Sequence, residues 1–238
     1  MGELEDYYNK DAKRFWSLKR ELSGRDRDVF SYIKRKEGVF LDYGCGAGSL
    51  LYALGSRKFE RLIGVDLSRV LVDSINSQVN EDANMPAIEA HVVVDDNLHF
   101  LESESVDSIA CLAVIEHVIN PYKTLDELFR VSKPGGELVL SVPNYAYLKH
   151  VFYLLFNKQP RTGTDRPVEE WRDAGWDGMH LHTFTKSSLE TLLNDCGWRV
   201  EFWCGSGTAF NFLGIGLLRK YFPSKWSGEL IVRCSKPS

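Results

Sequence analysis

Apolar runs alternate along the chain with stretches in which apolar residues recur at helical spacing. An apolar run begins at Val39 and is followed from Ser49 by helix-spaced leucines. Further apolar runs cover 61–65, 91–94, 106–118 and 137–142. Such alternation is typical of parallel strands joined by helices, so the chain is expected to form an α/β fold.

The two flanks of this region follow other patterns. Residues 3–36 predict two helices that are broken near Ser23-Gly24. Residues 145–184 start with an aromatic helix and interrupt the alternation. Ser187 and Glu190 have the spacing of a capping box for one more helix. Two closing strands are expected at 198–203 and 230–234, separated by an apolar, glycine-rich segment.

A glycine triplet marks the turn between the first strand and its helix. The run Asp42-Tyr43-Gly44-Cys45-Gly46-Ala47-Gly48 places three glycines two apart. Glycine adopts positive φ without strain and lets a ligand lie against the backbone. The dinucleotide fingerprint has the spacing Gly-x-Gly-x-x-Gly, and position 49 is serine, which makes a pyrophosphate cradle the weaker interpretation.

Asp66 ends the second apolar run, 24 residues after Asp42. A carboxylate at the tip of strand 2, about 20 residues beyond the turn, binds ribose hydroxyls in Rossmann-like folds. The alternative is that Asp66 only caps the helix that begins near Ser68. The glycine turn upstream favours ribose binding.

The run Leu41-Asp42-Tyr43-Gly44-Cys45-Gly46-Ala47-Gly48 resembles motif I of the class I S-adenosylmethionine (SAM)-dependent methyltransferases. The order Ile115-Glu116-His117-Val118, helix, Lys133-Pro134-Gly135-Gly136 as a turn, strand, Val142-Pro143-Asn144 is similar to the ubiquinone-pathway O-methyltransferases and related small-molecule enzymes. The resemblance implies a Rossmann-like, seven-stranded, mostly parallel sheet with helices on both faces and an antiparallel closing strand. The resemblance also implies that 1–37 form an N-terminal helical lid, the alternative being amphipathic helices that pack on the sheet. The length of 238 residues favours a single domain over 1–238. Within it, 145–184 are expected to form an inserted acceptor-pocket segment, the alternative being a peripheral helix that completes the core.

The same resemblance implies SAM as the cofactor and a set of residues that bind it. A carboxylate after strand 3 accepts a hydrogen bond from the adenine amino group in the family, and both Asp95 and Asp96 are candidates. Aromatic residues of the leading helix, Tyr7 or Tyr8, would fold over the cofactor. The expected cofactor-binding residues are Tyr8, Asp42, Gly44, Cys45, Gly46, Gly48, Asp66, Leu67, Asp95, Asp96, Asn97 and Ala113.

Few catalytic side chains are expected, because in-line methyl transfer depends mainly on alignment in a dry pocket. A hydroxyl acceptor benefits from a general base, and His117, expected at the end of strand 4, is the candidate. The alternative is a structural histidine. His180, His182 and Tyr147 of the inserted segment are the candidate substrate-binding residues.

No metal is expected. Ubiquinone-pathway relatives carry an acidic residue three positions before the Glu of Glu-His, where a divalent metal can bind. This chain has Ala113 at that position, so one ligand is missing.

Composition narrows the partners. The 29 Lys and Arg against 33 Asp and Glu give a net charge of −4, which argues against nucleic acid as the main partner. Five scattered cysteines, with no Cys-x-x-Cys, argue against a disulfide framework. There is no apolar run near the roughly 18 residues of a membrane span, and the expected location is the cytoplasm. A homodimer remains open.

The leading hypothesis is therefore a SAM-dependent methyltransferase that acts on a small molecule, at oxygen. Two alternatives use the same turn. An NAD-dependent oxidoreductase would bind NAD more tightly than SAM. A non-catalytic SAM-binding protein would bind SAM without turning over any acceptor.

Overall fold

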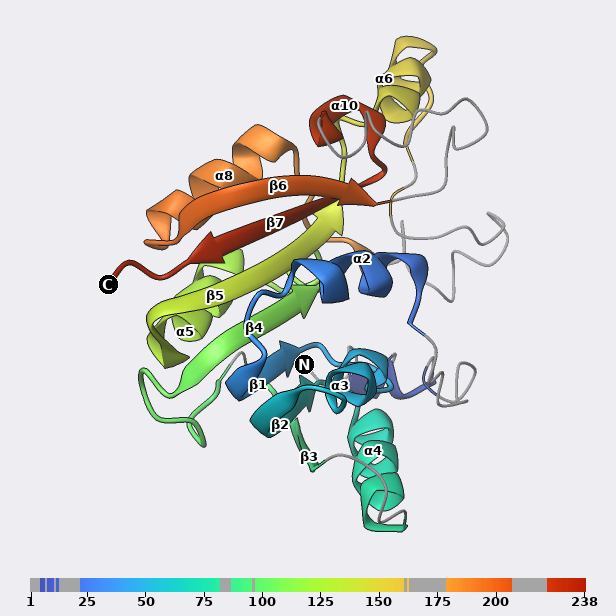
Figure 1. The fold of residues 1–238 in the computed structure, drawn as a ribbon. Helices are drawn as coiled ribbons and strands as arrows, with labels where there is room; N and C mark the ends of the chain where they lie inside the picture. The colour runs from blue at the N-terminus through green and yellow to red at the C-terminus, as the bar shows by residue number, and fades with distance from the viewer. Residues whose placement is uncertain are drawn as a thin grey trace.

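The computed structural model describes residues 5–6, 8–10, 12, 22–81, 87–95, 97–160, 162, 179–206 and 222–238. Helices and strands alternate through most of this part of the chain (Figure 1). In chain order they are α2 (Gly24–Tyr32), β1 (Glu37–Tyr43), α3 (Ser49–Leu54), β2 (Lys58–Asp66), α4 (Arg69–Glu81), β3 (Ile88–Val92), β4 (Val106–Leu112), α5 (Pro121–Val131), β5 (Ser132–Pro143), α6 (Leu148–Leu155), α8 (Lys186–Asp195), β6 (Arg199–Ser206), α10 (Pro223–Trp226) and β7 (Glu229–Ser235).

The strands form one seven-stranded sheet in the order β3-β2-β1-β4-β5-β7-β6. Pairing is parallel from β3 through β5. Strand β7 runs antiparallel to both of its neighbours, β5 and β6. This topology confirms the expected mostly parallel sheet with an antiparallel closing strand. Because β3, β2, β1, β4 and β5 are parallel, their carboxyl ends meet at one edge, where open α/β sheets bind ligands.

Two apolar layers cover the faces of the sheet. One layer packs α5 and α8 against the strands through residues such as Leu41 and Leu125. The other packs α2, α3 and α4 against the opposite face through residues such as Phe40 and Leu51. Neighbouring residues of β1 therefore point to opposite faces, as the period of a strand requires. The central strands are buried on both sides, which explains why they read as continuous apolar runs.

Three local expectations need correction. Strand β4 ends at Leu112, because the chain turns at Ala113 with a φ of 56°. His117 therefore lies in the loop before α5 rather than at the end of the strand. The Lys-Pro-Gly-Gly block belongs to β5, whose first residue, Ser132, already pairs with Val106. The capping box of α8 begins at Thr185, whose hydroxyl accepts the Ser188 N–H at 3.2 Å.

Some expected elements fall on residues that are not described. Most of the helix before Ser23, the segment 163–178 of the insert and residues 207–221 lie outside the described ranges. Among the described residues, none of the helices has the length and apolar character that crossing a membrane requires.

Candidate active site

The glycine turn joins β1 to α3 at the carboxyl edge of the sheet. Gly44, Gly46 and Gly48 have φ values of 80°, 53° and 79°, so all three need the conformational freedom of glycine. The N–H groups of Gly44 and Cys45 both donate to the Val65 carbonyl, at 2.8 and 2.9 Å, which ties the turn to the end of β2. A Cβ placed on Gly46 would meet open space. The backbone there is accessible to a ligand.

Asp66 closes the turn from the side of β2. One carboxylate oxygen accepts the Gly46 N–H at 2.9 Å, and the other accepts the Ser68 N–H at 2.8 Å. Burial raises the pKa of this carboxyl above its ordinary value, while the backbone N–H groups oppose the shift. The second bond ties Asp66 to the start of α4, as the capping interpretation proposed. Asp66 also lines the cavity beside the turn, where ribose binding stays a prediction.

A cavity of about 480 Å³ opens at this edge of the sheet. Its wall comes from the glycine turn, the ends of β2 and β3, the loop after β4 and the leading helical segment. The lining residues are Tyr8, Tyr43, Gly44, Gly46, Val65, Asp66, Leu67, Leu71, Val93, Asp95, Ala113, Val114, His117, Val118, Ile119, Asn120 and Lys123.

Most of the expected cofactor-binding residues lie in this wall. The members found there are Tyr8, Gly44, Gly46, Asp66, Leu67, Asp95 and Ala113. Between the two aspartates that the sequence left open, the structure places Asp95 at the cavity, and Asp96 lies outside the described residues. The other expected positions, Asp42, Cys45, Gly48 and Asn97, do not line it.

Burial, packing and one hydrogen bond explain why these four residues do not line the cavity. Asp42 is buried within β1, and Cys45 is buried under the turn. A Cβ on Gly48 would contact the side chain of Ile75 at 3.2 Å, so this glycine packs against α4. The side-chain Oδ1 of Asn97 accepts the backbone N–H of His99, two residues ahead, at 2.9 Å. They support the wall of the site without facing it.

His117 lines the same cavity as the glycine turn. Its Nδ1 is 3.2 Å from the Met179 carbonyl oxygen, which can only accept, so Nδ1 carries the proton and Nε2 carries the lone pair. The Tyr8 ring meets the His117 ring edge-on, with 6.1 Å between centroids. Burial, followed by the neighbouring His180, lowers the pKa of His117 to about 4. His117 is therefore neutral at physiological pH.

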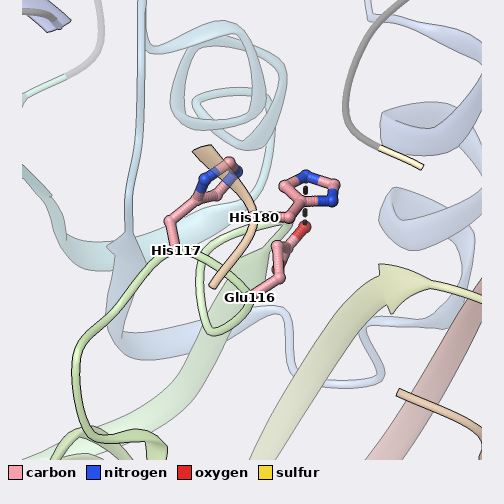
Figure 2. A group of neighbouring side chains, drawn as sticks. All are labelled: Glu116, His117 and His180. Carbon is pink, nitrogen blue, oxygen red and sulfur yellow. Dashed lines mark ion pairs between the residues drawn. The ribbon is translucent and has the colours of Figure 1, made fainter. Parts of the chain in front are cut away.

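Two further side chains lie next to His117. Glu116 precedes it in the chain, and the His180 ring packs against it with 4.6 Å between centroids. The Glu116 backbone carbonyl accepts the N–H groups of Leu181 and His182, at 2.8 and 3.1 Å, and this fixes the segment that carries His180. Figure 2 shows the Glu116 carboxylate pointing at the His180 ring, with His117 on one side. Glu116 is 1% exposed, and burial raises its pKa to about 8.

The other two candidate substrate-binding residues, His182 and Tyr147, lie outside the cavity wall. His182 Nε2 is 2.9 Å from the carbonyl oxygen of Val118, a wall residue, so His182 supports the loop. Tyr147 is buried at the start of α6 and packs edge-on against His150, at 5.4 Å between centroids. Neither residue lines the cavity.

Sequence reasoning missed part of the wall. Lys123 of α5 reaches back to donate from Nζ to the Asp95 carbonyl at 2.7 Å. Val114 and Asn120 come from the loop before that helix. Asn120 could have been found, because its Asn-Pro pair marks the start of α5 beside the end of β4. Lys123 carries no comparable signal, since its position depends on the packing of α5.

A doubly wound sheet with a glycine turn, an acidic residue at the tip of β2 and a cavity between them defines a Rossmann-like nucleoside-binding protein. Residues 8–201 match a family model described as a methyltransferase domain. The chain belongs to this family. It is a SAM-dependent methyltransferase, and S-adenosylmethionine is its cofactor. Family membership therefore argues against the NAD-dependent alternative.

Curated relatives share about a quarter of the aligned residues. The ubiquinone biosynthesis O-methyltransferase of Coxiella burnetii is 27% identical, covering 65% of this chain and 69% of the relative. The ubiquinone/menaquinone biosynthesis C-methyltransferase UbiE of Geotalea daltonii is also 27% identical, covering 65% and 70%. A mitochondrial O-methyltransferase of Dictyostelium discoideum is 27% identical, and the match covers 48% of this chain and 38% of the relative.

Solved structures agree on the fold. A SAM-dependent methyltransferase from Aquifex aeolicus superposes with a TM-score of 0.64, at 18% identity, covering 96% of this chain and 98% of the other. A putative methyltransferase solved in complex with the Haloferax volcanii Trm112 activator gives a TM-score of 0.70, at 18% identity, covering 98% and 97%. At this identity the comparison establishes the architecture.

Proposed function

We propose that the protein transfers the methyl group of SAM to the oxygen of a small hydroxyl-bearing molecule. The observation that carries the proposal is the position of His117, which faces the same cavity as the glycine turn and Asp66. A cofactor held by Asp66 on one side leaves His117 and the loop after β4 for the acceptor. The lone pair on Nε2 supplies an acceptor for a hydroxyl hydrogen bond.

The shape and lining of the cavity support a small acceptor. The volume of about 480 Å³ falls in the range of small-molecule sites, and the acceptor shares this space with the cofactor. Part of the wall beside His117 is apolar, including the half-buried Val114 and Val118, which lowers the access of water to the reacting atoms. Bound SAM would supply an electrophilic methyl group. As the acceptor oxygen bonds to the methyl carbon, the electron pair of the carbon–sulfur bond would stay on sulfur, and His117 Nε2 would accept the hydroxyl proton.

The curated relatives support the small-molecule class and leave the methylated atom to experiment. Two of them are named as O-methyltransferases and one as a C-methyltransferase. His117 favours oxygen, because an oxygen nucleophile gains from a neighbouring hydrogen-bond acceptor. We place the protein in the cytoplasm as part of the same proposal.

The test is turnover against a panel of phenols, catechols and aliphatic hydroxyl compounds, measured as formation of S-adenosylhomocysteine. His117→Ala is expected to lower kcat by about 10²–10⁴-fold, the usual contribution of a positioned acid–base group, while SAM affinity stays near wild type. His99→Ala, an exposed histidine outside the cavity wall, serves as the matched control. Wild-type turnover in His117→Ala would show that His117 is structural. SAM binding without turnover of any acceptor would favour a non-catalytic role.

A further inference from the structure

Three side chains come together at the edge of the cavity, from two segments that lie far apart in sequence. Glu116 and His117 come from the loop after β4, and His180 comes from the segment before α8. Their nearest ligand-type atoms all lie within 4.8 Å of one another. His180 Nε2 is 4.0 Å from a Glu116 carboxylate oxygen, and the two histidine rings are 4.6 Å apart between centroids (Figure 2).

Both imidazoles have a partner at Nδ1. His117 Nδ1 donates to the Met179 carbonyl at 3.2 Å, and His180 Nδ1 lies 2.9 Å from the Thr162 hydroxyl. Metal-binding histidines almost always use one ring nitrogen for such an outer partner, which fixes the tautomer and leaves the other nitrogen for the ion. In this chain the remaining nitrogen is Nε2 in both rings.

The Glu116 carboxylate has an unusual environment. Glu116 is 1% exposed, and neither carboxylate oxygen has a hydrogen-bond partner among the described residues. A buried carboxylate without a partner is costly, and such groups are ordinarily paired or coordinate a metal. Figure 2 shows that the carboxylate points at His180 within this group. A cation between the three side chains would supply the partner that the two buried oxygens lack.

We propose that Glu116, His117 and His180 form a binding site for one divalent transition-metal ion. Two imidazole nitrogens and one carboxylate suit zinc, iron, cobalt or manganese better than calcium or magnesium. The expectation of no metal rested on Ala113, the position where related enzymes carry an acidic ligand. His180, which sequence reasoning assigned to the acceptor, supplies a third ligand from a different segment.

Three protein ligands leave coordination positions open, as in catalytic rather than structural sites. Of the three ligands, His117 lines the cavity, so an ion held by its Nε2 would lie beside the acceptor. A bound divalent ion acts as a Lewis acid that lowers the pKa of a coordinated hydroxyl. When the ion is bound, it takes the lone pair of His117 Nε2, so the acceptor hydroxyl would contact the ion in place of the imidazole. This use of the ion in methyl transfer rests on the proposed function, whereas its binding does not.

Binding of cobalt to the metal-stripped full chain tests the site without any turnover. Co²⁺ is titrated after dialysis against a chelator, and both the heat of binding and the visible absorption of the ion are recorded. The wild type is expected to bind one Co²⁺ per chain with absorption bands of a nitrogen–oxygen site. Glu116→Gln and His180→Asn should each lower the affinity more than about tenfold, the loss that follows even from removing an outer partner of a ligand.

His99→Asn is the control, because His99 is an exposed histidine outside both the cavity wall and the three-residue group. Its Co²⁺ affinity should equal that of the wild type. SAM titration of every variant separates the two proposals, since a folded variant that has lost only the ion keeps its SAM affinity. Absence of saturable one-to-one binding, or equal affinity in the wild type, Glu116→Gln and His180→Asn, overturns the metal site. Failure of the wild type to turn over any acceptor would overturn the proposed function alone.

Discussion

Asp66 shows how one carboxylate can serve the fold and the site together. Its two oxygens accept N–H groups from the glycine turn and from the start of α4, so it joins three elements at the edge of the sheet. Each carboxylate oxygen has lone pairs for more than one hydrogen bond, which leaves capacity for ribose hydroxyls. The bonds to Gly46 and Ser68 hold the group in the orientation that faces the cavity.

Asp66→Ala is expected to weaken SAM binding by about ten- to a hundred-fold. The loss corresponds to hydrogen bonds to a charged acceptor, worth roughly 1.5–3 kcal/mol. Isothermal titration with SAM measures it, with Asp73→Ala as the control, because Asp73 is an exposed carboxylate on α4. Unchanged affinity in a folded Asp66→Ala protein would contradict ribose binding at this residue.

The site residues that the sequence predicts are those whose positions depend on neighbouring residues in the chain. The three glycines are marked by the positive φ of the turn, and Asp66 by its distance along the chain. The approach of His180 to Glu116 depends on how the segment before α8 packs on the loop after β4. No spacing in the sequence predicts this packing, so the grouping of Glu116, His117 and His180 is seen only in the structure.

At the scale of elements, Asn144 anchors the start of the inserted segment. Its side-chain amide nitrogen lies 3.2, 3.1 and 2.8 Å from the carbonyl oxygens of Pro223, Ser224 and Ser227. Its side-chain oxygen accepts the Ala146 N–H at 3.0 Å. Asn144 is fully buried, and these bonds join the end of β5 to α10. The residue thereby sets the direction in which the chain leaves the sheet.

Asn144→Ala should lower the free energy of unfolding by about 2–3 kcal/mol, because it leaves buried backbone groups without partners. Urea denaturation measures the change, and Asn194→Ala on the exposed face of α8 is the control. SAM affinity of the folded protein should be retained, since Asn144 is outside the cavity wall. A loss below about 0.5 kcal/mol would show that the anchor is dispensable.

Element types were predicted well, and element ends less well. Asn120 caps α5 as expected, with its side-chain oxygen 3.1 Å from the Tyr122 N–H. The Lys-Pro-Gly-Gly block failed as a turn because the Gly135 N–H donates to the Lys236 carbonyl at 2.9 Å, a contact with the far end of the chain. The capping box of α8 is formed by Thr185 and Ser188 instead of Ser187 and Glu190. Both pairs have the same three-residue spacing, so the sequence alone does not distinguish them.

At the scale of the whole molecule, the site lies over a group of buried acids. Asp42 is buried beneath the glycine turn, and burial raises its pKa to about 8, with Asp26 and Asp66 adding to the shift and Arg25 opposing it. Unfolded aspartate titrates near pH 4. The folded protein therefore holds an extra proton between about pH 4 and 8, and stability falls as pH rises through that window.

The measurable window is pH 6.5 to 8. Below it, His117 acts in the opposite direction, because its depressed pKa makes the unfolded state bind more protons. Within it, wild-type stability should fall with pH, and Asp42→Asn should reduce the slope by about 1 kcal/mol per pH unit. Glu116 adds a slope of the same sign that the variant retains. Urea unfolding at each pH, in chelator, tests this, and parallel curves for the two proteins would contradict it.

The order of strands also bears on how the molecule assembles. Strand β6 reaches the sheet only through β7, which follows it in the chain and inserts between β6 and β5. Until β7 has docked, the outer edge of β5 and the inner edge of β6 both lack the pairing they have in the finished sheet. Unpaired strand edges invite association between chains, and long-range pairing is slow to form. Completion of the sheet by β7 is therefore the step at which a refolding chain is most exposed to aggregation.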